Sequence, residues 1–190
     1  MQYPLNIWVY HFDLEGNTIS SHTYSPSSNV NGGTSIVQLN NGNVIVAGRN
    51  ENPYVFALGR NLYEPNIINN MLWNVSYGTG IGATNLLVDQ NDNIYYSTYS
   101  NTGSSFDVVK INSDGDLLWN HHFDEYYTAD VHDIDLALAP DGGVVFSGRQ
   151  LNNADINNPI IKFSPDGDIE WSLNLDDYSE IDVARAIEYQ

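Results

Sequence analysis

The sequence predicts an all-β protein built from a repeated unit of four antiparallel strands. Three segments, 34–49, 84–99 and 134–149, align without gaps, and each has two apolar or aromatic stretches around a polar turn. The turn pairs Asn-Gly, Asn-Asp and Asp-Gly recur every fifty residues and tolerate positive φ. Alternation at period two dominates, and no helical periodicity competes with it. Each segment is therefore expected to form a strand, a tight turn and a second strand.

A second hairpin follows the first one in each unit. Segments 110–119 and 162–171 match position for position, and both carry an Asp-Gly turn followed by a tryptophan in the next strand. Segment 8–19 repeats this hairpin near the N-terminus, with Gly16 in the turn. The first full unit is the loosest copy, because an extended loop is expected over 59–71 before its tryptophan. Two hairpins per unit give four strands.

Repetition at this period predicts a β-propeller. A blade of four short strands cannot bury both of its faces, so neighbouring units must stack around an axis. We expect one domain over residues 1–190, either a ring of about four blades or a fragment of a larger propeller. Its expected parts are a partial blade at 1–30, blades at about 31–80, 81–130 and 131–180, and a terminal strand at 181–190.

The expected first and last strands leave one blade incomplete. The N-terminal pair and the terminal strand together lack the second strand of a blade. In a fragment, an uncovered blade face and unpaired strand edges are expected, and such surfaces favour self-association.

The charge balance excludes some classes of partner. Six basic and 24 acidic residues give a net charge of −18. This charge repels the phosphates of nucleic acids and the surface of anionic membranes, so neither is an expected partner. No apolar run approaches the roughly twenty residues that span a bilayer, so no membrane insertion is expected. Cysteine is absent, which excludes disulfides and thiolate sites. The acidity also has a simpler interpretation, which is solubility.

The third unit carries the most complete version of the repeat. It has a Gly-Gly pair after Asp141, Gly148 at the end of the second strand, Lys162 in the third strand, and an Asp-Gly turn leading to Trp171. These residues resemble tandem repeats common in bacterial secreted and cell-surface proteins, and the resemblance extends over nearly the whole chain. It implies a propeller fold and an extracellular or cell-surface location. It implies no particular reaction.

Two other propeller groups are similar over short segments. Three residues separate glycine from tryptophan in Gly115/Trp119 and Gly167/Trp171, as in quinoprotein-like repeats, where the tryptophan packs between blades. The Asp-box S-x-D-x-G-x-x-W is approached by 113–119 and 164–171 with altered spacing. Asp-boxes are structural turns, so this similarity does not imply glycosidase chemistry.

Three equivalent positions suggest a ligand-binding rim. Arg49, Tyr99 and Arg149 each end the second strand of a unit, on the side where successive units connect. Two arginines there are able to grip a carboxylate through bidentate hydrogen bonds. The alternative interpretation is that they pair with neighbouring acidic residues.

An acidic loop before the third unit supplies the other candidates. Asp130, His132 and Asp133 are assigned to the same rim, and Asp130, Asp133 and Asp135 form a candidate metal site. Calcium is the candidate ion because hard cations take several oxygen ligands, although no EF-hand spacing is present. The adjacent pair His121-His122 is not expected to bind one ion, because successive strand residues point to opposite faces.

These features favour a non-catalytic ligand-binding or protein-interaction module. Its expected partner is a protein or a glycan, since tyrosines beside Asn and Asp are typical of sugar sites as well as of packing between blades. The alternative is a carbohydrate-active enzyme, glycosidase-like, with carboxylates on the rim; 24 acidic residues always allow a pair. No catalytic residue is assigned, and no cofactor other than calcium is expected.

Overall fold

The described part of the chain contains only β-strands as regular secondary structure. The computed structural model describes residues 6–24, 32–50, 52–60, 68–99, 105–124, 134–148, 150–152, 155–175 and 188. The all-β class predicted from the sequence is confirmed. Within these residues no helix is long and apolar enough to cross a bilayer.

The strands fall into one N-terminal hairpin and three units. The N-terminal hairpin consists of β1 (Ile7–Phe12) and β2 (Thr18–Tyr24). The first unit consists of β3 (Gly32–Gln38), β4 (Val44–Asn50), β5 (Asn52–Arg60) and β6 (Ile68–Val75). The second unit consists of β7 (Gly82–Val88), β8 (Ile94–Tyr99), β9 (Ser105–Ile111) and β10 (Leu117–Asp124). The third unit consists of β11 (Asp135–Leu138), β12 (Val144–Ser147), β13 (Gln150–Asn152), β14 (Asp155–Phe163) and β15 (Ile169–Leu175).

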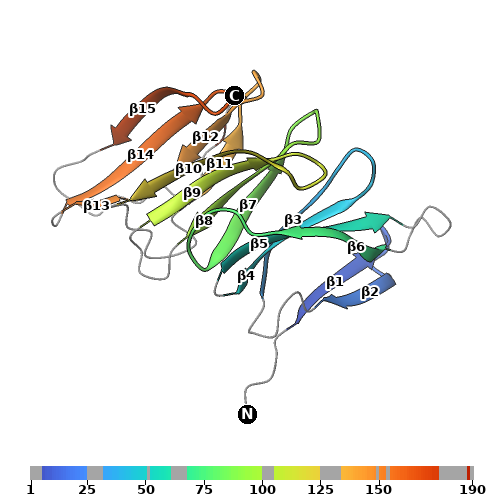
Figure 1. Ribbon diagram of the computed structural model, residues 1–190. Coiled ribbons are helices and arrows are strands. Elements are labelled where there is room, and N and C mark those ends of the chain that lie inside the picture. The colour runs from blue at the N-terminus through green and yellow to red at the C-terminus, as the bar shows by residue number, and fades with distance from the viewer. Residues whose placement is uncertain are drawn as a thin grey trace, which may run out of the picture.

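Each unit is an antiparallel meander. The pairing orders are β3-β4-β5-β6, β7-β8-β9-β10 and β11-β12-β14-β15, while β13 pairs with the N-terminal part of β14. A single residue pair, Arg49 with Gly82, joins the first two units into one eight-stranded sheet. The units follow one another in a curved, open array that runs from β1 and β2 to β15 (Figure 1). The described strands do not close into a ring.

Six hairpin turns among the described residues share one hydrogen-bond pattern. In the first unit, the Gly42 amide donates to the Leu39 carbonyl at 2.9 Å, and the Leu39 amide donates to the Asn43 carbonyl at 2.9 Å. This is a three-residue loop closed by a G1 bulge. Only the second residue of each predicted turn pair has positive φ, for example Gly42 at 87° and Asp92 at 61°. In the described turns this position is occupied by glycine five times and by Asp92 once.

The core lies between the units, as the stacking argument predicts. One apolar cluster joins the first and second units, including Ala47 and Tyr96. A second cluster joins the second and third units, including Phe106 and Phe146, whose rings stack at 4.2 Å between centroids. A third cluster places the N-terminal hairpin on the first unit. Each of these three interfaces therefore buries apolar side chains from both of the parts that it joins.

In the first and second units, the tryptophan of the last strand packs on the last turn of the next unit. The Trp73 indole nitrogen donates to the Ser113 carbonyl at 3.0 Å, and the Trp119 indole nitrogen donates to the Pro165 carbonyl at 3.1 Å. A β-carbon on the turn glycine, Gly115 or Gly167, would lie within 2.9 Å of the tryptophan ring. We call this contact the tryptophan dock.

The loop expected over 59–71 is shorter than predicted. Strand β5 continues to Arg60 and β6 begins at Ile68, so the ladder extends into residues that lack a strong apolar alternation. Irregular register at two points of this ladder accommodates the extra residues. Of the terminal segment 181–190, the structure describes only Glu188, so the expected last strand lies outside the described residues.

Candidate functional site

The molecule has two ends that differ in their loops. At the turn end lie the six hairpin turns, and at the loop end lie the connections between the second and third strands and between successive units. The sequence assigned ligand binding to the loop end. The structure describes a polar cluster at the loop end and a pocket at the turn end.

Two of the predicted rim residues can be placed. Arg49 is exposed at the end of β4, and its side chain lies beside Gly32. Tyr99 is buried at the end of β8, where its ring lies over Gly82 and its carbonyl accepts a hydrogen bond from the Ile81 amide at 2.9 Å. Tyr99 therefore packs in the apolar cluster that joins the second and third units.

The acidic loop is largely outside the described residues. Asp130, His132 and Asp133 of this loop, and Arg149 after β12, lie outside the described residues, so the arginine pair and the calcium site remain predictions. Asp135 begins β11, half-buried, and its carboxylate accepts a hydrogen bond from the Leu136 amide at 2.9 Å. Among the residues that the structure places, no group of three His, Asp or Glu side chains is arranged to hold a metal ion.

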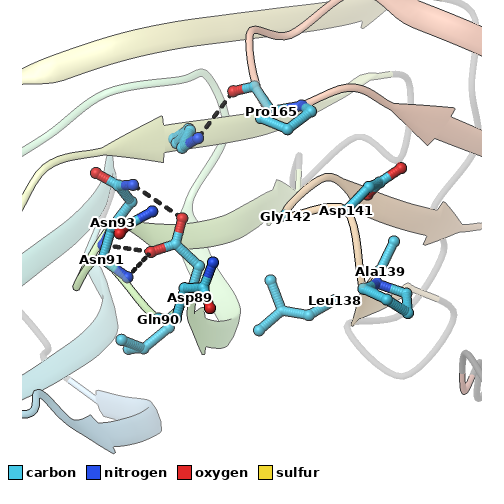
Figure 2. A pocket seen from close by; sticks show the side chains of 12 residues that line it. Asp89, Gln90, Asn91, Asn93, Leu138, Ala139, Asp141, Gly142 and Pro165 are labelled. Atoms are coloured by element: carbon cyan, nitrogen blue, oxygen red, sulfur yellow. Dashed lines mark hydrogen bonds between the residues drawn. The ribbon is translucent and has the colours of Figure 1, made fainter.

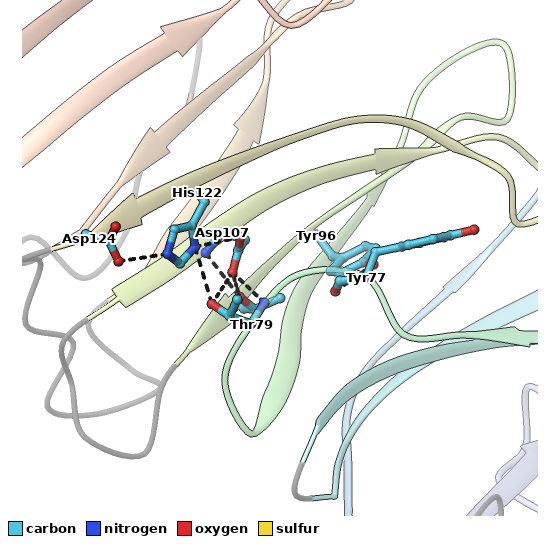
Figure 3. Close-up of polar contacts among 7 residues, drawn as sticks. Tyr77, Thr79, Tyr96, Asp107, His122 and Asp124 are labelled. Carbon is cyan, nitrogen blue, oxygen red and sulfur yellow. Dashed lines mark hydrogen bonds and ion pairs between the residues drawn. The ribbon is translucent and has the colours of Figure 1, made fainter.

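A buried carboxylate organises the loop end of the second unit. The side chain of Asp107, on β9, is completely buried. It accepts hydrogen bonds from the Thr79 amide at 2.6 Å, the Thr79 hydroxyl at 2.7 Å and the Thr98 hydroxyl at 2.9 Å. His122 Nδ1 lies 3.0 Å from its other oxygen (Figure 3). We call Thr79, Thr98, Asp107, His122 and Asp124 the Asp107 cluster.

His122 is held between two carboxylates. Its Nδ1 contacts Asp107 and its Nε2 lies 2.8 Å from Asp124 Oδ1. Burial alone would lower the pKa of His122, but the hydrogen bonds to Asp124 and Asp107 outweigh that effect and raise the pKa. Each ring nitrogen lies within hydrogen-bond distance of a carboxylate oxygen, and only the protonated imidazole is able to donate to both carboxylates at once. The contacts tie β9, β10 and the connection at Thr79 together.

The histidine pair behaves as strand alternation predicts. His121 faces the third unit, where its ring packs 5.1 Å from the Phe163 ring and Nε2 contacts the Gly167 carbonyl. His122 points to the opposite face, toward Asp107. Sequence reasoning missed the role of Asp107. The available signal was an aspartate within an otherwise apolar stretch of a predicted strand, where a buried charge requires partners.

A pocket of about 250 Å³ lies at the turn end, between the second and third units (Figure 2). The first turn of the second unit and the first turn of the third unit form two of its sides. Its lining residues are Val88, Asp89, Gln90, Asn91, Asn93, Lys110, Leu138, Ala139, Pro140, Asp141, Gly142 and Pro165.

The acidic groups of this turn-end pocket are already engaged. The buried Asp89 carboxylate accepts hydrogen bonds from the Asn91 amide at 2.8 Å, the Asn93 amide at 2.9 Å and the Asn93 side chain at 2.8 Å. Asp141 accepts from Lys162 Nζ at 2.9 Å and from the Gly143 amide at 2.8 Å. The hydrogen bond from Lys162 is the main cause that lowers the pKa of Asp141.

The single lysine of the pocket is also fixed. Lys110 Nζ donates to the Pro165 carbonyl at 2.8 Å and lies 4.9 Å from the centre of the Tyr95 ring. Burial lowers the pKa of Lys110, against the effect of the nearby Asp89 and Asp166 carboxylates. The pocket thus combines hydrogen-bonded polar turns with apolar surface from Leu138, Pro140 and Pro165. Such a mixture suits a small ligand that carries hydroxyl groups.

Comparison with known proteins gives information on the fold only. No protein-family model and no curated protein matches the sequence. Among solved structures, a protein of unknown function from Bacteroides caccae is similar, with a TM-score of 0.54 and 10% identity. The match covers 90% of this chain and 58% of that protein. The chain therefore spans little more than half the length of this structural relative.

Proposed function

We propose that the chain is a β-propeller, or an arc of one, that acts as a non-catalytic binding module at the cell surface or outside the cell. The observation that carries the proposal is the turn-end pocket between two stacked units. Its two turns are fixed by backbone hydrogen bonds and by the Asp89 carboxylate. A preorganised concave site of this kind loses little entropy when it binds a ligand.

A glycan is the ligand class that fits the lining best. The side chains of Gln90 and Asn91 provide amide donors and acceptors, and Asp141 remains half-exposed as an acceptor. Pro140 and Pro165, which also line the pocket, offer apolar surface for the C–H face of a sugar ring. The net charge of −18 disfavours anionic ligands, so a neutral sugar is expected.

The same groups argue for binding without turnover. Glycoside hydrolysis requires one carboxylic acid with a raised pKa and a second carboxylate free to act as base or nucleophile. In the pocket, Asp141 has a lowered pKa because Lys162 donates to it, and three donors occupy Asp89. Neither group matches the required acid.

A glycan array probed with the purified chain tests the proposal. The double variant Gln90→Ala/Asn91→Ala is expected to weaken binding of the captured glycan by roughly tenfold or more, because about 1 kcal/mol is lost per hydrogen bond. Glu15→Ala, in the exposed turn of the N-terminal hairpin, is the matched control and should bind like the wild type. Binding that the double variant leaves unchanged would place the ligand elsewhere and contradict the proposal.

A hydrolysis screen of the captured glycans separates binding from the enzymatic alternative. Binding without turnover supports the proposed module. Turnover that is lost in Asp130→Asn or Asp133→Asn would instead support a carbohydrate-active enzyme at the loop end.

A further inference from the structure

The tryptophan dock is part of a larger repeated interface. Alternate residues of β10, namely Trp119, His121 and Phe123, face the third unit and surround Phe163. In the first unit, Trp73 and its alternate neighbours on β6 and beyond pack in the same way on the second unit. Each internal interface thus has a donor face on the last strand of one unit. The opposing receptor face is the third strand and last turn of the next unit.

The third unit ends in a donor face that no receptor face covers among the described residues. Trp171 pairs across the ladder with Lys162, as Trp119 pairs with Lys110, so the two tryptophans occupy equivalent positions. The donor face of β15 consists of Trp171, Leu173 and Leu175. Their side chains are 41%, 56% and 52% exposed. Three apolar side chains in a row are rarely left uncovered on one strand face.

The N-terminal hairpin offers a receptor face on which no donor face packs within the described part of the chain. Phe12 is equivalent to Phe163, because each is the last strand residue before its turn. Each also pairs with the second residue after the turn glycine, Phe12 with Thr18 and Phe163 with Ile169. Trp8, Tyr10 and Phe12 form a ladder of stacked rings with centroids 6.0 Å and 5.8 Å apart. They are 60%, 49% and 52% exposed, and Leu14 in the following turn is fully exposed.

The turn of this hairpin is shaped to receive a tryptophan. Gly16 has φ of 85°, close to the 87° of Gly115 and the 95° of Gly167. A β-carbon on Gly115 or Gly167 would strike a tryptophan ring, whereas a β-carbon on Gly16 would meet nothing within 4 Å. Gly16 therefore has the turn geometry of the tryptophan dock, and no described residue of the same copy occupies the place of the tryptophan.

We propose that a second copy of this chain docks head to tail, with its β15 donor face on the β1 receptor face of the first copy. Trp171 of one copy lies over Gly16 of the other and donates from its indole nitrogen to a turn carbonyl. Continuity with the two internal interfaces carries this assignment, because it repeats their residue types, register and turn geometry. The donor and receptor faces of one copy lie at opposite ends of the curved array, so they do not meet each other (Figure 1).

Head-to-tail contact has a defined consequence for symmetry. The interface is heterologous, since two different faces meet, and each copy carries one of each. Such contacts give a closed ring when the curvature closes and a filament when it does not. Because both copies carry a net charge of −18, added salt is expected to strengthen the association by screening their repulsion.

Molar mass measured over a range of protein and salt concentrations tests the proposal. The wild type is expected to form dimers or larger species. Trp171→Asp and Tyr10→Asp each place a charge in the apolar contact, and each is expected to weaken association on the order of 100-fold or more. Ile36→Asp changes an exposed apolar residue that belongs to neither face, and it should associate like the wild type.

Mixing the two variants distinguishes head-to-tail docking from other arrangements. Trp171→Asp retains its receptor face and Tyr10→Asp retains its donor face, so the mixture should recover one intact interface and form a heterodimer. Neither variant should dimerise alone. A contact between identical faces would not be restored by mixing.

Three outcomes would overturn the proposal. One is a wild type that stays monomeric at every concentration and salt condition. Another is association that neither variant reduces. The third is a compact wild-type monomer that expands on either substitution, since this would show that the two faces meet within one copy. Glycan binding at the turn-end pocket involves neither face, so its success or failure is read separately.

Discussion

The indole nitrogen of Trp119 donates a hydrogen bond to the Pro165 carbonyl, 3.1 Å away, across the boundary between the second and third units. The residues are 46 positions apart in the chain. The indole ring also covers Gly167, in the same turn. The Trp119 side chain thus makes both an apolar contact and a hydrogen bond across the boundary between two units. Substitutions at this residue therefore test how strongly the units are held together.

Trp119→Ala is expected to lower the free energy of unfolding by about 3 kcal/mol, because the half-buried ring leaves a cavity against Phe163. Urea denaturation followed by circular dichroism measures this change. Leu118→Ala removes an exposed apolar side chain from the adjacent position of the same strand, and its effect should stay within about 0.5 kcal/mol. Equal losses in the two variants would contradict the interface role of Trp119.

Gly167→Ala and Gly16→Ala separate backbone strain from the tryptophan dock. Both glycines have positive φ, at 95° and 85°, so each alanine carries a backbone cost of about 1 kcal/mol. Only at Gly167 does the added β-carbon approach a ring, 2.8 Å from Trp119.

Gly167→Ala should therefore lower the free energy of unfolding by clearly more than Gly16→Ala does. The comparison is made by chemical denaturation at a protein concentration where the chain is monomeric. If the two alanines cost the same, the ring contact at Gly167 contributes nothing measurable.

His122 should titrate above its ordinary value near 6.5, because Asp124 and Asp107 favour its protonated form more than burial disfavours it. Because the folded-state pKa is raised, the pairing of His122 stabilises the fold fully at pH values below the unfolded-state pKa. This contribution is lost as the pH rises through the folded value.

The pKa itself is measured by NMR on the imidazole carbon-bound protons. Asp124→Asn removes the exposed partner and should move the pKa of His122 downward without unfolding the protein. In denaturation experiments, the advantage of the wild type over His122→Gln should shrink over the pH range that begins near the ordinary value of 6.5 and ends above the raised folded-state pKa. A constant advantage over that range would show that the charged form plays no part.

Asp107→Ala is expected to be strongly destabilising, by about 3 kcal/mol, because it strands the buried hydroxyl of Thr98 and the amide of Thr79. Thermal unfolding measures the loss. Asp124→Ala, which removes an exposed carboxylate of the same cluster, should cost much less. Similar losses in the two would mean that the burial of Asp107 is not what makes the cluster important.

Much of the fold was predictable because it is encoded locally. The six turns depend on residues within four positions of one another, and the strands depend on alternation between neighbours. The opposite orientation of His121 and His122 follows from the same alternation. The sequence indicated turn pairs that tolerate positive φ, and in the structure only the second residue of each pair has it.

The candidate sites were much less predictable. The pocket arises where the turn at Asp89 meets the turn at Asp141, a contact that exists only after the second and third units stack. The Asp107 cluster likewise gathers Thr79, Thr98 and His122 from separate strands and a connection between units. The sequence pattern of a single strand does not predict which polar residues of other strands will lie beside it.

By itself, the sequence determined the all-β class, the period of the repeat and the conformation of its turns, because these follow from backbone preferences and side-chain alternation over a few residues. The tertiary structure alone decided which polar groups share a pocket, which carboxylate is buried and which apolar faces stay uncovered. Those properties depend on how far one unit is rotated and shifted against the next. That geometry is set by the packing of whole faces rather than by any short stretch of chain.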